Sequence, residues 1–254
     1  MPKQPRRPDE RKASEHDCIY GIRASLAVFD VRRADIERVA VSRAVRGDVD
    51  PLVKWATQRG IPCREERDDE LASLTHSQNH EGLCLVTKPR KFVAQADLAE
   101  LLSRRKGSAV ALDRVRNPYN VGAIVRTAAF FGVDAVILGA PAPHPALAPD
   151  AVRVAEGGAE HVALARTTDL ADTLARLRKR GIAIVGADAA AKASARTFRF
   201  ARPVVIVVGH EREGLGARMR EQCDTLVAIE GSGVVESLNV AVAAGVLISS
   251  ITEG

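Results

Sequence analysis

Residues 226–250 read LVAIEGSGVVESLNVAVAAGVLISS, and this stretch is the most informative about the class of fold. It begins with an apolar run of strand length at 226–229, which is followed by a loop that contains two glycines. An aliphatic and alanine-rich segment comes next, in which Leu238 and Val242 recur at helical spacing. Ser237 stands immediately before this segment, where its hydroxyl group can cap a helix. The stretch therefore predicts a strand, a glycine loop and a buried C-terminal helix.

The start of this helix has two interpretations. Asn239 places a polar amide among the apolar side chains of the first turn, close to Ser237 and to the glycine loop. Polar groups at a strand–loop–helix junction are typical of small-molecule sites in α/β proteins. The same residues would serve equally well in a capped core helix. The stretch by itself leaves both interpretations open.

The composition favours a cytoplasmic protein and is compatible with a nucleic-acid partner. The formal net charge is +5, and Lys and Arg make most contacts to phosphate groups, although many soluble enzymes are equally basic. No apolar run reaches the ~18–20 residues of a membrane helix, and the N-terminus lacks the apolar core of a signal peptide. The four cysteines form no C-x-x-C pair, which argues against a zinc site and against a disulfide framework.

The hydrophobic pattern divides the chain into four parts. Residues 1–16 are polar and basic and predict a flexible tail. Residues 17–90 predict a small mixed α/β unit, and residues 91–107 predict a linker with a short amphipathic helix at 97–105. Residues 108–254 predict an open α/β fold with a parallel sheet, because several of its strands are apolar on both faces.

The predicted elements of the two units alternate along the chain. In the first unit we expect helices at 19–30, 50–60 and 68–76, and strands at 36–43, 61–66 and 82–88. In the second unit we expect strands at 109–112, 135–138, 162–164, 182–185, 204–208 and 226–229, and helices at 121–131, 169–180 and 217–222 and from 238 onward.

Two histidines of the first unit, His76 and His80, have the i, i+4 spacing of metal ligands on a helix. Neither a glutamate base nor a third ligand accompanies them, so a turn or a loop that faces the substrate is the favoured interpretation. We expect no metal site.

Open α/β sheets bind ligands beyond the carboxyl ends of their strands. Asn120 follows the first strand of the second unit, where it can cap a helix that begins at Val121, and Gly122 would let another backbone approach. Arg126 lies on the same helix and could bind an anion or a phosphate. Glu211 follows the strand at 204–208, in a glycine-rich segment that lacks both the dinucleotide fingerprint and the P-loop pattern.

Three segments resemble, in this order, the motifs of the SpoU/TrmH family of SPOUT methyltransferases. They are NPYNVGAIVRTA at 117–128, VVGHEREGLG at 207–216 and AIEGSGVVESLNVAVA at 228–243. The resemblance covers residues 108–254. Residues 17–90 are similar to the small ribosomal-protein-like RNA substrate-binding domain that many members carry.

The resemblance implies a trefoil-knotted SPOUT domain in a homodimer. It also implies transfer of a methyl group from S-adenosyl-L-methionine to a ribose 2′-hydroxyl of structured RNA, with rRNA favoured over tRNA. The catalytic residues that it implies are Asn120, Arg126, Glu211, Ser237 and Asn239. The cofactor-binding residues that it implies are Gly209, Ile229 and Leu238.

We expect Arg126 to orient the hydroxyl group and an RNA phosphate, because an arginine guanidinium stays protonated in proteins. Asn120 and Glu211 would hold its side chain, and Ser237 and Asn239 would shape the methyl-transfer pocket.

One departure from the family pattern favours an alternative. The family commonly has Pro-Met after the isoleucine of the third motif, and this chain has Glu230 and Gly231. Loss of the proline would relax the loop, as expected for a non-catalytic RNA-binding or assembly factor, whereas the retained polar residues favour an enzyme. A nucleotide-dependent oxidoreductase is a more distant alternative, because no dinucleotide fingerprint is present.

Overall fold

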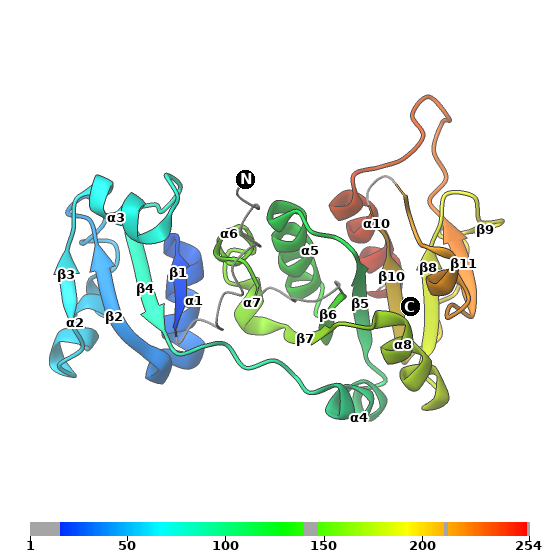
Figure 1. The fold of residues 1–254 in the computed structure, drawn as a ribbon, viewed down its shortest axis with the longest axis horizontal. Helices are drawn as coiled ribbons and strands as arrows, with labels where there is room; N and C mark the ends of the chain where they lie inside the picture. Colours follow the sequence, from blue (N-terminus) through cyan, green and yellow to red (C-terminus); the bar gives the residue numbers. More distant parts are fainter. Residues whose placement is uncertain (1–15, 140–146, 211–212, 253–254) are drawn as a thin grey trace, which may run out of the picture.

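The structure is a computed structural model that describes residues 16–139, 147–210 and 213–252. It consists of two units that lie side by side along the long axis of the molecule, each built on its own β-sheet (Figure 1). The predicted tail lies outside the described residues except for His16. Among the helices of the described part, none is long and apolar enough to cross a membrane.

The first unit contains a mixed four-stranded sheet in the order β1-β4-β2-β3. Strands β1 and β2 pair antiparallel with β4, and β3 pairs parallel with β2. The strands are β1 (Asp17–Tyr20), β2 (Ile36–Val41), β3 (Cys63–Glu65) and β4 (Leu83–Thr87). The helices are α1 (Ile22–Arg32), α2 (Asp50–Gln58) and α3 (Asp68–Thr75), with a short 3-10 turn at Arg33–Asp35.

The prediction of a single helix at 19–30 is wrong at its start. Ile19 and Tyr20 are buried in β1 and pair with β4, and helix α1 begins only at Ile22. Gly21 separates the two elements with a φ of +91°, a conformation that side-chain-bearing residues rarely adopt. The apolar pattern continues across this break, which is why periodicity alone merges the strand with the helix.

The second unit contains a seven-stranded sheet in the order β7-β6-β5-β10-β8-β11-β9, and every neighbouring pair is parallel. The strands are β5 (Ser108–Asp113), β6 (Ala135–Gly139), β7 (Ala163–Thr167), β8 (Ala183–Ala187), β9 (Ala193–Ser194), β10 (Val204–Val208) and β11 (Thr225–Ala228). All residues of β5, β6 and β10 are buried. The predicted parallel sheet, covered on both faces, is confirmed.

Helices cover both faces of this sheet. They are α4 (Gln95–Arg105), α5 (Pro118–Phe130), α6 (Pro149–Val154), α7 (Gly158–His161), α8 (Leu170–Lys179), α9 (Ala217–Arg220) and α10 (Val240–Thr252). Helices α5 and α10 pack against each other and share one apolar core with alternate residues of β10, such as Ile206. The other residues of β10, such as Val207, share a second core with α4 and α8.

Two predicted helix starts need correction. Helix α5 begins at Pro118 and is capped by Asn117, whose side-chain oxygen accepts from the Tyr119 backbone N–H at 2.9 Å, so Asn120 is not the cap. Proline at the first helical position moves the start three residues upstream of the prediction. Helix α10 begins at Val240, and its first turn is capped by Asn239 instead of Ser237, because Asn239 Oδ1 accepts from the Ala241 N–H at 2.8 Å.

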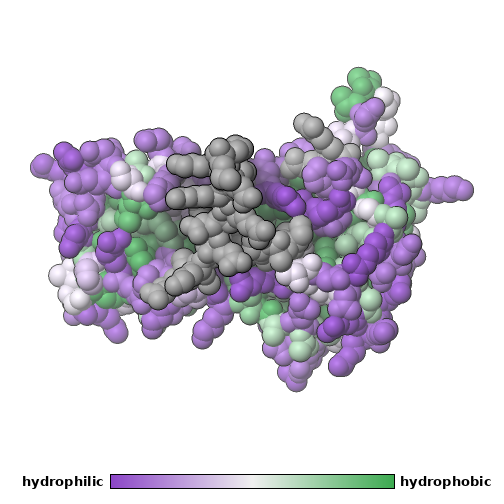
Figure 2. Space-filling view, in the orientation of Figure 1, coloured by the Kyte–Doolittle hydropathy of each residue, from purple (hydrophilic) through white to green (hydrophobic). Residues whose placement is uncertain are grey.

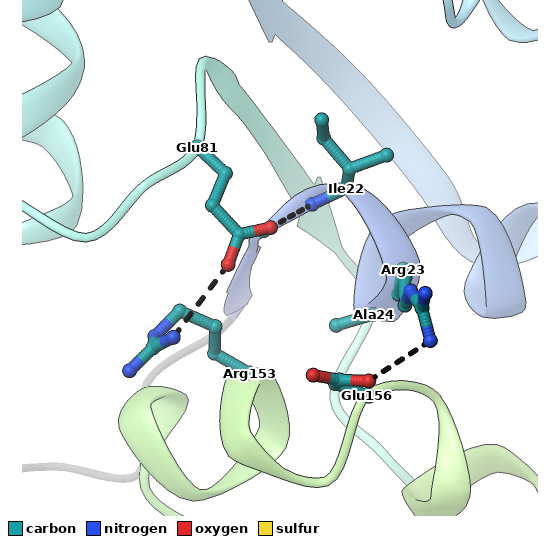
Figure 3. Close-up of a pocket in the computed structure, with 7 residues that line it drawn as sticks. Ile22, Arg23, Ala24, Glu81, Arg153 and Glu156 are labelled. Carbon is teal, nitrogen blue, oxygen red and sulfur yellow. Dashed lines mark hydrogen bonds and ion pairs between the residues drawn. The ribbon is translucent and has the colours of Figure 1, made fainter.

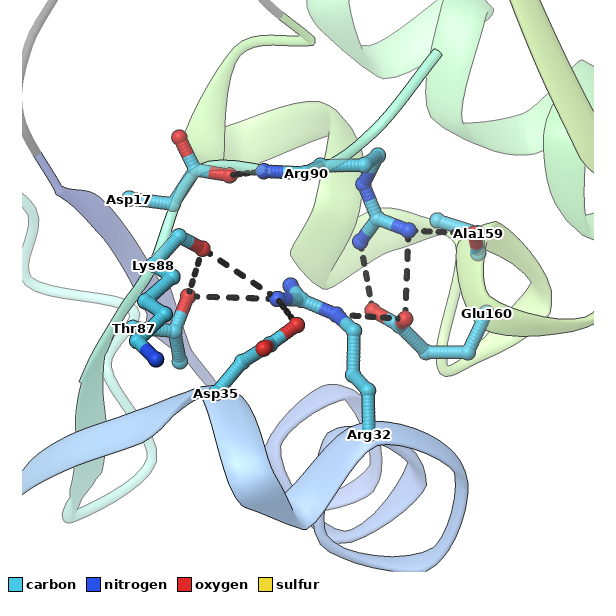
Figure 4. Close-up of polar contacts among 8 residues, drawn as sticks. All are labelled: Asp17, Arg32, Asp35, Thr87, Lys88, Arg90, Ala159 and Glu160. Carbon is cyan, nitrogen blue, oxygen red and sulfur yellow. Dashed lines mark hydrogen bonds and ion pairs between the residues drawn. The ribbon is translucent and has the colours of Figure 1, made fainter. Parts of the chain in front are cut away.

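The two units are joined through α7 of the second unit. The Glu160 side chain on α7 is 2% exposed and is held by two arginines of the preceding chain (Figure 4). Arg32 Nε donates to Glu160 Oε2 at 2.9 Å, and Arg90 contacts both carboxylate oxygens. One apolar core also extends from β2 and β4 of the first unit into α5, α6 and α7 of the second. The first unit is therefore docked firmly on the second.

Candidate active site at the carboxyl ends of β5, β10 and β11

The three loops that contain the predicted site residues leave the same edge of the second sheet. Strand β10 pairs parallel with both β5 and β8, and β11 pairs parallel with β8. Because parallel strands end on one side, the loop before α5, the loop after β10 and the loop after β11 emerge together. Figure 1 shows the long loop between β11 and α10 projecting from this edge.

Asn120 and Asn239 meet at the starts of two adjacent helices. Asn239 Nδ2 donates to Asn120 Oδ1 at 3.1 Å, although the two residues lie 119 positions apart in the chain. The Asn239 side-chain oxygen caps α10, so both ends of its amide have partners and its orientation is determined. Asn120 is 9% exposed, in the first turn of α5. The structure thus brings together one residue of the first motif and one of the third.

Gly122 seats a neighbouring segment against α5, as the sequence predicts. A Cβ atom at this position would lie 2.5 Å from the backbone oxygen of Ala151 and 2.7 Å from Val154 Cβ. Only glycine allows helix α6 to approach α5 this closely. This contact positions the α6–α7 segment beside the helix that carries Asn120.

The loop after β10 folds back tightly on the end of the strand. A Cβ atom at Gly209 would lie 2.4 Å from the backbone carbon of Gly214, so no larger residue fits. Arg114, which follows β5, donates to the Gly214 backbone oxygen at 3.1 Å and to Glu213 at 2.6 Å. Burial opposes the charge of Arg114, but its hydrogen bonds to Glu213 and Asp113 outweigh this effect and raise its pKa. Arg114, which the sequence did not single out, therefore ties this loop to β5.

Glu211 belongs to the same loop and lies outside the described residues. Its predicted role remains a prediction.

The loop after β11 leaves apolar side chains exposed next to the sheet edge. Ile229 packs partly against the main core, whereas Leu238 is 45% exposed and Val234 is 86% exposed. Figure 2 shows apolar side chains at the tip of the projecting loop, where Val234 and Val235 are the most exposed large apolar residues of the loop. Ser237 is exposed in the same loop. Nothing lies within 4 Å of a Cβ atom built at Gly231, so packing does not require glycine there.

Arg126 has a partner that the sequence analysis missed. It lies six residues beyond Asn120, about 9 Å further along the axis of α5. Its Nη2 atom is 2.9 Å from Glu156 Oε2, in the corner between α6 and α7. The only local signal for this corner is the Gly157–Gly158 pair, which marks a turn and says nothing about which helix it contacts. The contact that the structure describes for Arg126 is therefore with Glu156, which the hypothesis that Asn120 and Glu211 hold Arg126 leaves out.

The histidines of the first unit occupy a turn. His76 ends α3 with a φ of +53°, and His80 is buried, with its Nδ1 atom accepting from the Gly82 N–H at 3.0 Å. Across the described part of the chain, no group of three or more His, Cys, Asp or Glu residues could hold a metal ion.

Comparison with known proteins assigns both units to a family. Residues 107–249 match the model of the SpoU rRNA methylase family, and residues 18–93 match that of the RNA 2′-O ribose methyltransferase substrate-binding domain. The chain belongs to the SpoU rRNA methylase family. The resemblance drawn from the three motifs is thus confirmed at the level of the family.

Individual relatives of this family match along nearly the whole chain. The 23S rRNA (guanosine-2′-O-)-methyltransferase RlmB of Vibrio vulnificus is 34% identical over 238 residues, which are 92% of this chain and 95% of that protein. A TrmH family tRNA/rRNA methyltransferase of Bacillus subtilis, YacO, is 28% identical and covers 94% of this chain and 96% of its own.

A solved structure confirms the fold of this chain. The SpoU methyltransferase AviRb from Streptomyces viridochromogenes, in complex with AdoMet, matches with a TM-score of 0.78 at 20% identity. The match covers 94% of this chain and 90% of that one. The two-unit architecture is therefore shared with a methyltransferase structure that contains this cofactor.

Proposed function

We propose that the protein is an RNA ribose 2′-O-methyltransferase that uses S-adenosyl-L-methionine and acts on ribosomal RNA. The contact between Asn120 and Asn239 carries this proposal, because it joins the first and third motifs at the sheet edge where α/β proteins bind ligands. The 34% identity to a 23S rRNA (guanosine-2′-O-)-methyltransferase supports ribosomal RNA as the substrate. The family's substrate-binding domain at 18–93 supports RNA binding by the first unit.

The residues at the sheet edge fit the cofactor. S-adenosyl-L-methionine would supply an activated methyl group, and its adenine ring needs an apolar surface with backbone polar groups around it. Ile229 and Leu238 offer apolar side chains at the start and the end of one loop, and Leu238 is half exposed although it is apolar. We propose that these two residues and the backbone of Gly209 hold the cofactor.

Methyl transfer requires that the ribose 2′-oxygen bond to the methyl carbon while the carbon–sulfur bond breaks. The electron pair of that bond would return to the sulfur and leave a neutral thioether, and the hydroxyl proton would pass to solvent water. We propose that Arg126 orients this hydroxyl and a neighbouring phosphate, since its charged guanidinium can bind two oxygens at once. Asn239, oriented by its helix cap and by Asn120, would shape the methyl-transfer pocket together with Ser237. Glu211 completes the proposed set through its place in the second motif.

Replacement of Arg126 by alanine tests this assignment. We expect the rate of methyl transfer at saturating RNA and cofactor to fall by a factor of about 100 or more, which is the scale of the loss when a reacting group is no longer held in position. Arg176→Ala is the control, because Arg176 is exposed on α8 and pairs with Asp172 of the same helix. Full methyl transfer by the Arg126→Ala protein would refute the role of Arg126.

The identity of the substrate needs a separate experiment. Mapping of ribose methylation across total RNA, with and without the protein, should reveal a protein-dependent methyl group in ribosomal RNA. A protein-dependent methyl group found only in tRNA would refute ribosomal RNA as the substrate and identify tRNA instead.

The loop at Glu230 and Gly231 favours a second candidate, a non-catalytic assembly factor. Calorimetry with S-adenosyl-L-methionine separates the two. Binding supports the enzyme, and no binding at millimolar cofactor supports the assembly factor.

We also propose a homodimer formed through α5 and α10. Val242 and Val246 lie one turn apart on α10 and are 53% and 41% exposed, and Phe130 at the end of α5 is 83% exposed. The two helices are in contact near these residues, because a Cβ atom at Gly245 would lie 3.8 Å from Thr127 Cγ2. Sedimentation of the wild-type protein should give a dimer, and Val246→Glu should shift it towards the monomer.

The trefoil knot that the family resemblance implies is part of the same proposal. It is supported by the strand order, since β8 separates β10 from β11 and the chain then returns from β11 to pack α10 against α5. An experimental structure that traces residues 204–252 continuously would test it.

A further inference from the structure

Glu156 links the proposed catalytic arginine to the N-terminal unit. Its Oε2 atom lies 2.9 Å from Arg126 Nη2 and 3.1 Å from Arg23 Nη1. Arg126 belongs to α5 of the second unit, and Arg23 belongs to the first turn of α1 in the first unit (Figure 3 shows Arg23 and Glu156). A single carboxylate oxygen therefore contacts one guanidinium group from each unit.

An unusual backbone conformation places Glu156 between α1 and α5. Its φ is +45°, a left-handed conformation that is costly for a residue with a side chain and is found mainly where the surroundings enforce it. The two glycines that follow it pack against α1 and α5, respectively. A Cβ atom at Gly157 would lie 2.8 Å from Ala27 Cβ of α1, and one at Gly158 would lie 3.0 Å from Arg126 Cα of α5.

The link contributes little to stability. The side chains of Arg23, Arg126 and Glu156 are 75%, 53% and 35% exposed, and ion pairs with this exposure are usually worth less than about 1 kcal/mol. The docking of the two units is secured elsewhere, by the enclosed Glu160 cluster. A strained glutamate that adds little stability points to a role in orienting Arg126.

A second glutamate beside the same cavity provides a natural comparison. The cavity has a volume of about 220 Å³ and lies between the units, with both Glu81 and Glu156 in its lining (Figure 3). Glu81 also has a positive φ, of +53°, but it accepts from the Ile22 N–H at 3.0 Å and pairs with Arg153 at 3.5 Å. Of the two carboxylates, Glu156 is the one for which the structure gives a contact with Arg126.

We propose that Glu156 is a positioning residue that aims the Arg126 guanidinium and, through Arg23, makes its orientation depend on the docked N-terminal unit. This inference rests on the proposed role of Arg126 in methyl transfer. RNA that binds the first unit would then meet an arginine already oriented by that unit.

The test compares Glu156→Gln with Glu81→Gln, which removes the same charge from the same cavity. At saturating RNA and cofactor we expect kcat of Glu156→Gln to fall about tenfold. Its KM for RNA should not rise, because removal of a negative charge does not weaken binding to phosphates. Glu156→Asp, which keeps the charge, should recover most of the rate, and Glu81→Gln should stay within twofold of the wild type.

Two kinetic outcomes would overturn the proposal. One is a kcat of Glu156→Gln within twofold of the wild type. The other is an equal fall in kcat for Glu81→Gln, which would assign the effect to charge in the cavity instead of contact with Arg126.

A readout without activity separates this inference from the proposed function. In ¹⁵N NMR spectra of the full chain without RNA, the side-chain Nε signals of Arg126 and Arg23 should change in Glu156→Gln, and the Arg126 signal should stay unchanged in Glu81→Gln. A wild-type protein that methylates no RNA would refute the proposed function but leave these signals to decide whether Glu156 holds Arg126. An Arg126 signal identical in Glu156→Gln and the wild type would refute the inference.

Discussion

Replacement of Glu160 by glutamine removes the negative charge from the ion cluster that joins the two units (Figure 4). The side chains of Glu160, Arg90 and Arg32 are 2%, 9% and 15% exposed. Loss of one partner from a buried ion pair costs ~3–5 kcal/mol, because the remaining charge stays buried without compensation. Here the arginines keep other acceptors, since Arg90 also donates to the Ala159 backbone oxygen at 2.6 Å and Arg32 to that of Lys88 at 3.3 Å. We therefore expect the lower end of this range, about 3 kcal/mol.

Urea unfolding at pH 7 measures this loss as a difference in the free energy of unfolding. In a thermal scan it corresponds to a fall in Tm of about 6–12 °C for a chain of this size. Glu100→Gln is the matched control, because Glu100 pairs with Arg104 on the exposed face of α4, where the two side chains are 57% and 78% exposed. The control should change stability by less than about 0.5 kcal/mol. A loss below about 1 kcal/mol for Glu160→Gln, or equal losses for both variants, would refute the reasoning.

Two further changes probe packing and protonation. Gly122→Ala should lower stability by about 1–3 kcal/mol in urea unfolding, because its Cβ would lie 2.5 Å from the Ala151 oxygen, whereas Gly47→Ala, with nothing within 4 Å, should be close to neutral. Burial and a 2.6 Å hydrogen bond to Asp150 raise the pKa of Tyr20 to about 12. The native state therefore keeps a proton that the unfolded chain loses above pH ~10, so this contribution to stability is complete below pH ~10 and is lost as the pH rises through about 12. Tyr20→Phe should lack that decline, and parallel stability curves for the two proteins between pH 9 and 12 would contradict this.

Local patterns predicted most of the second unit, and the errors have physical causes. The runs at 109–112, 135–138 and 204–208 are apolar on both faces, as expected of strands covered on both sides, and each is a buried strand in the structure. The start of α5 was misplaced because Asn-Pro is both a turn signal and a helix start, and the chain uses it as the cap and first residue. Strand β1 was missed because the apolar pattern runs through Gly21 without a break.

The sequence by itself determined the parallel sheet, the order of the three motifs and the family, because these depend on residue types and spacings within short segments. It also predicted that Gly122 lies against another backbone, since a missing side chain is visible in the sequence. Only the tertiary structure showed that Asn239 contacts Asn120 and that Glu156 contacts both Arg126 and Arg23. These partners are separated by up to 133 residues. Their pairing depends on how whole helices and units pack, and no local period in the sequence encodes that packing.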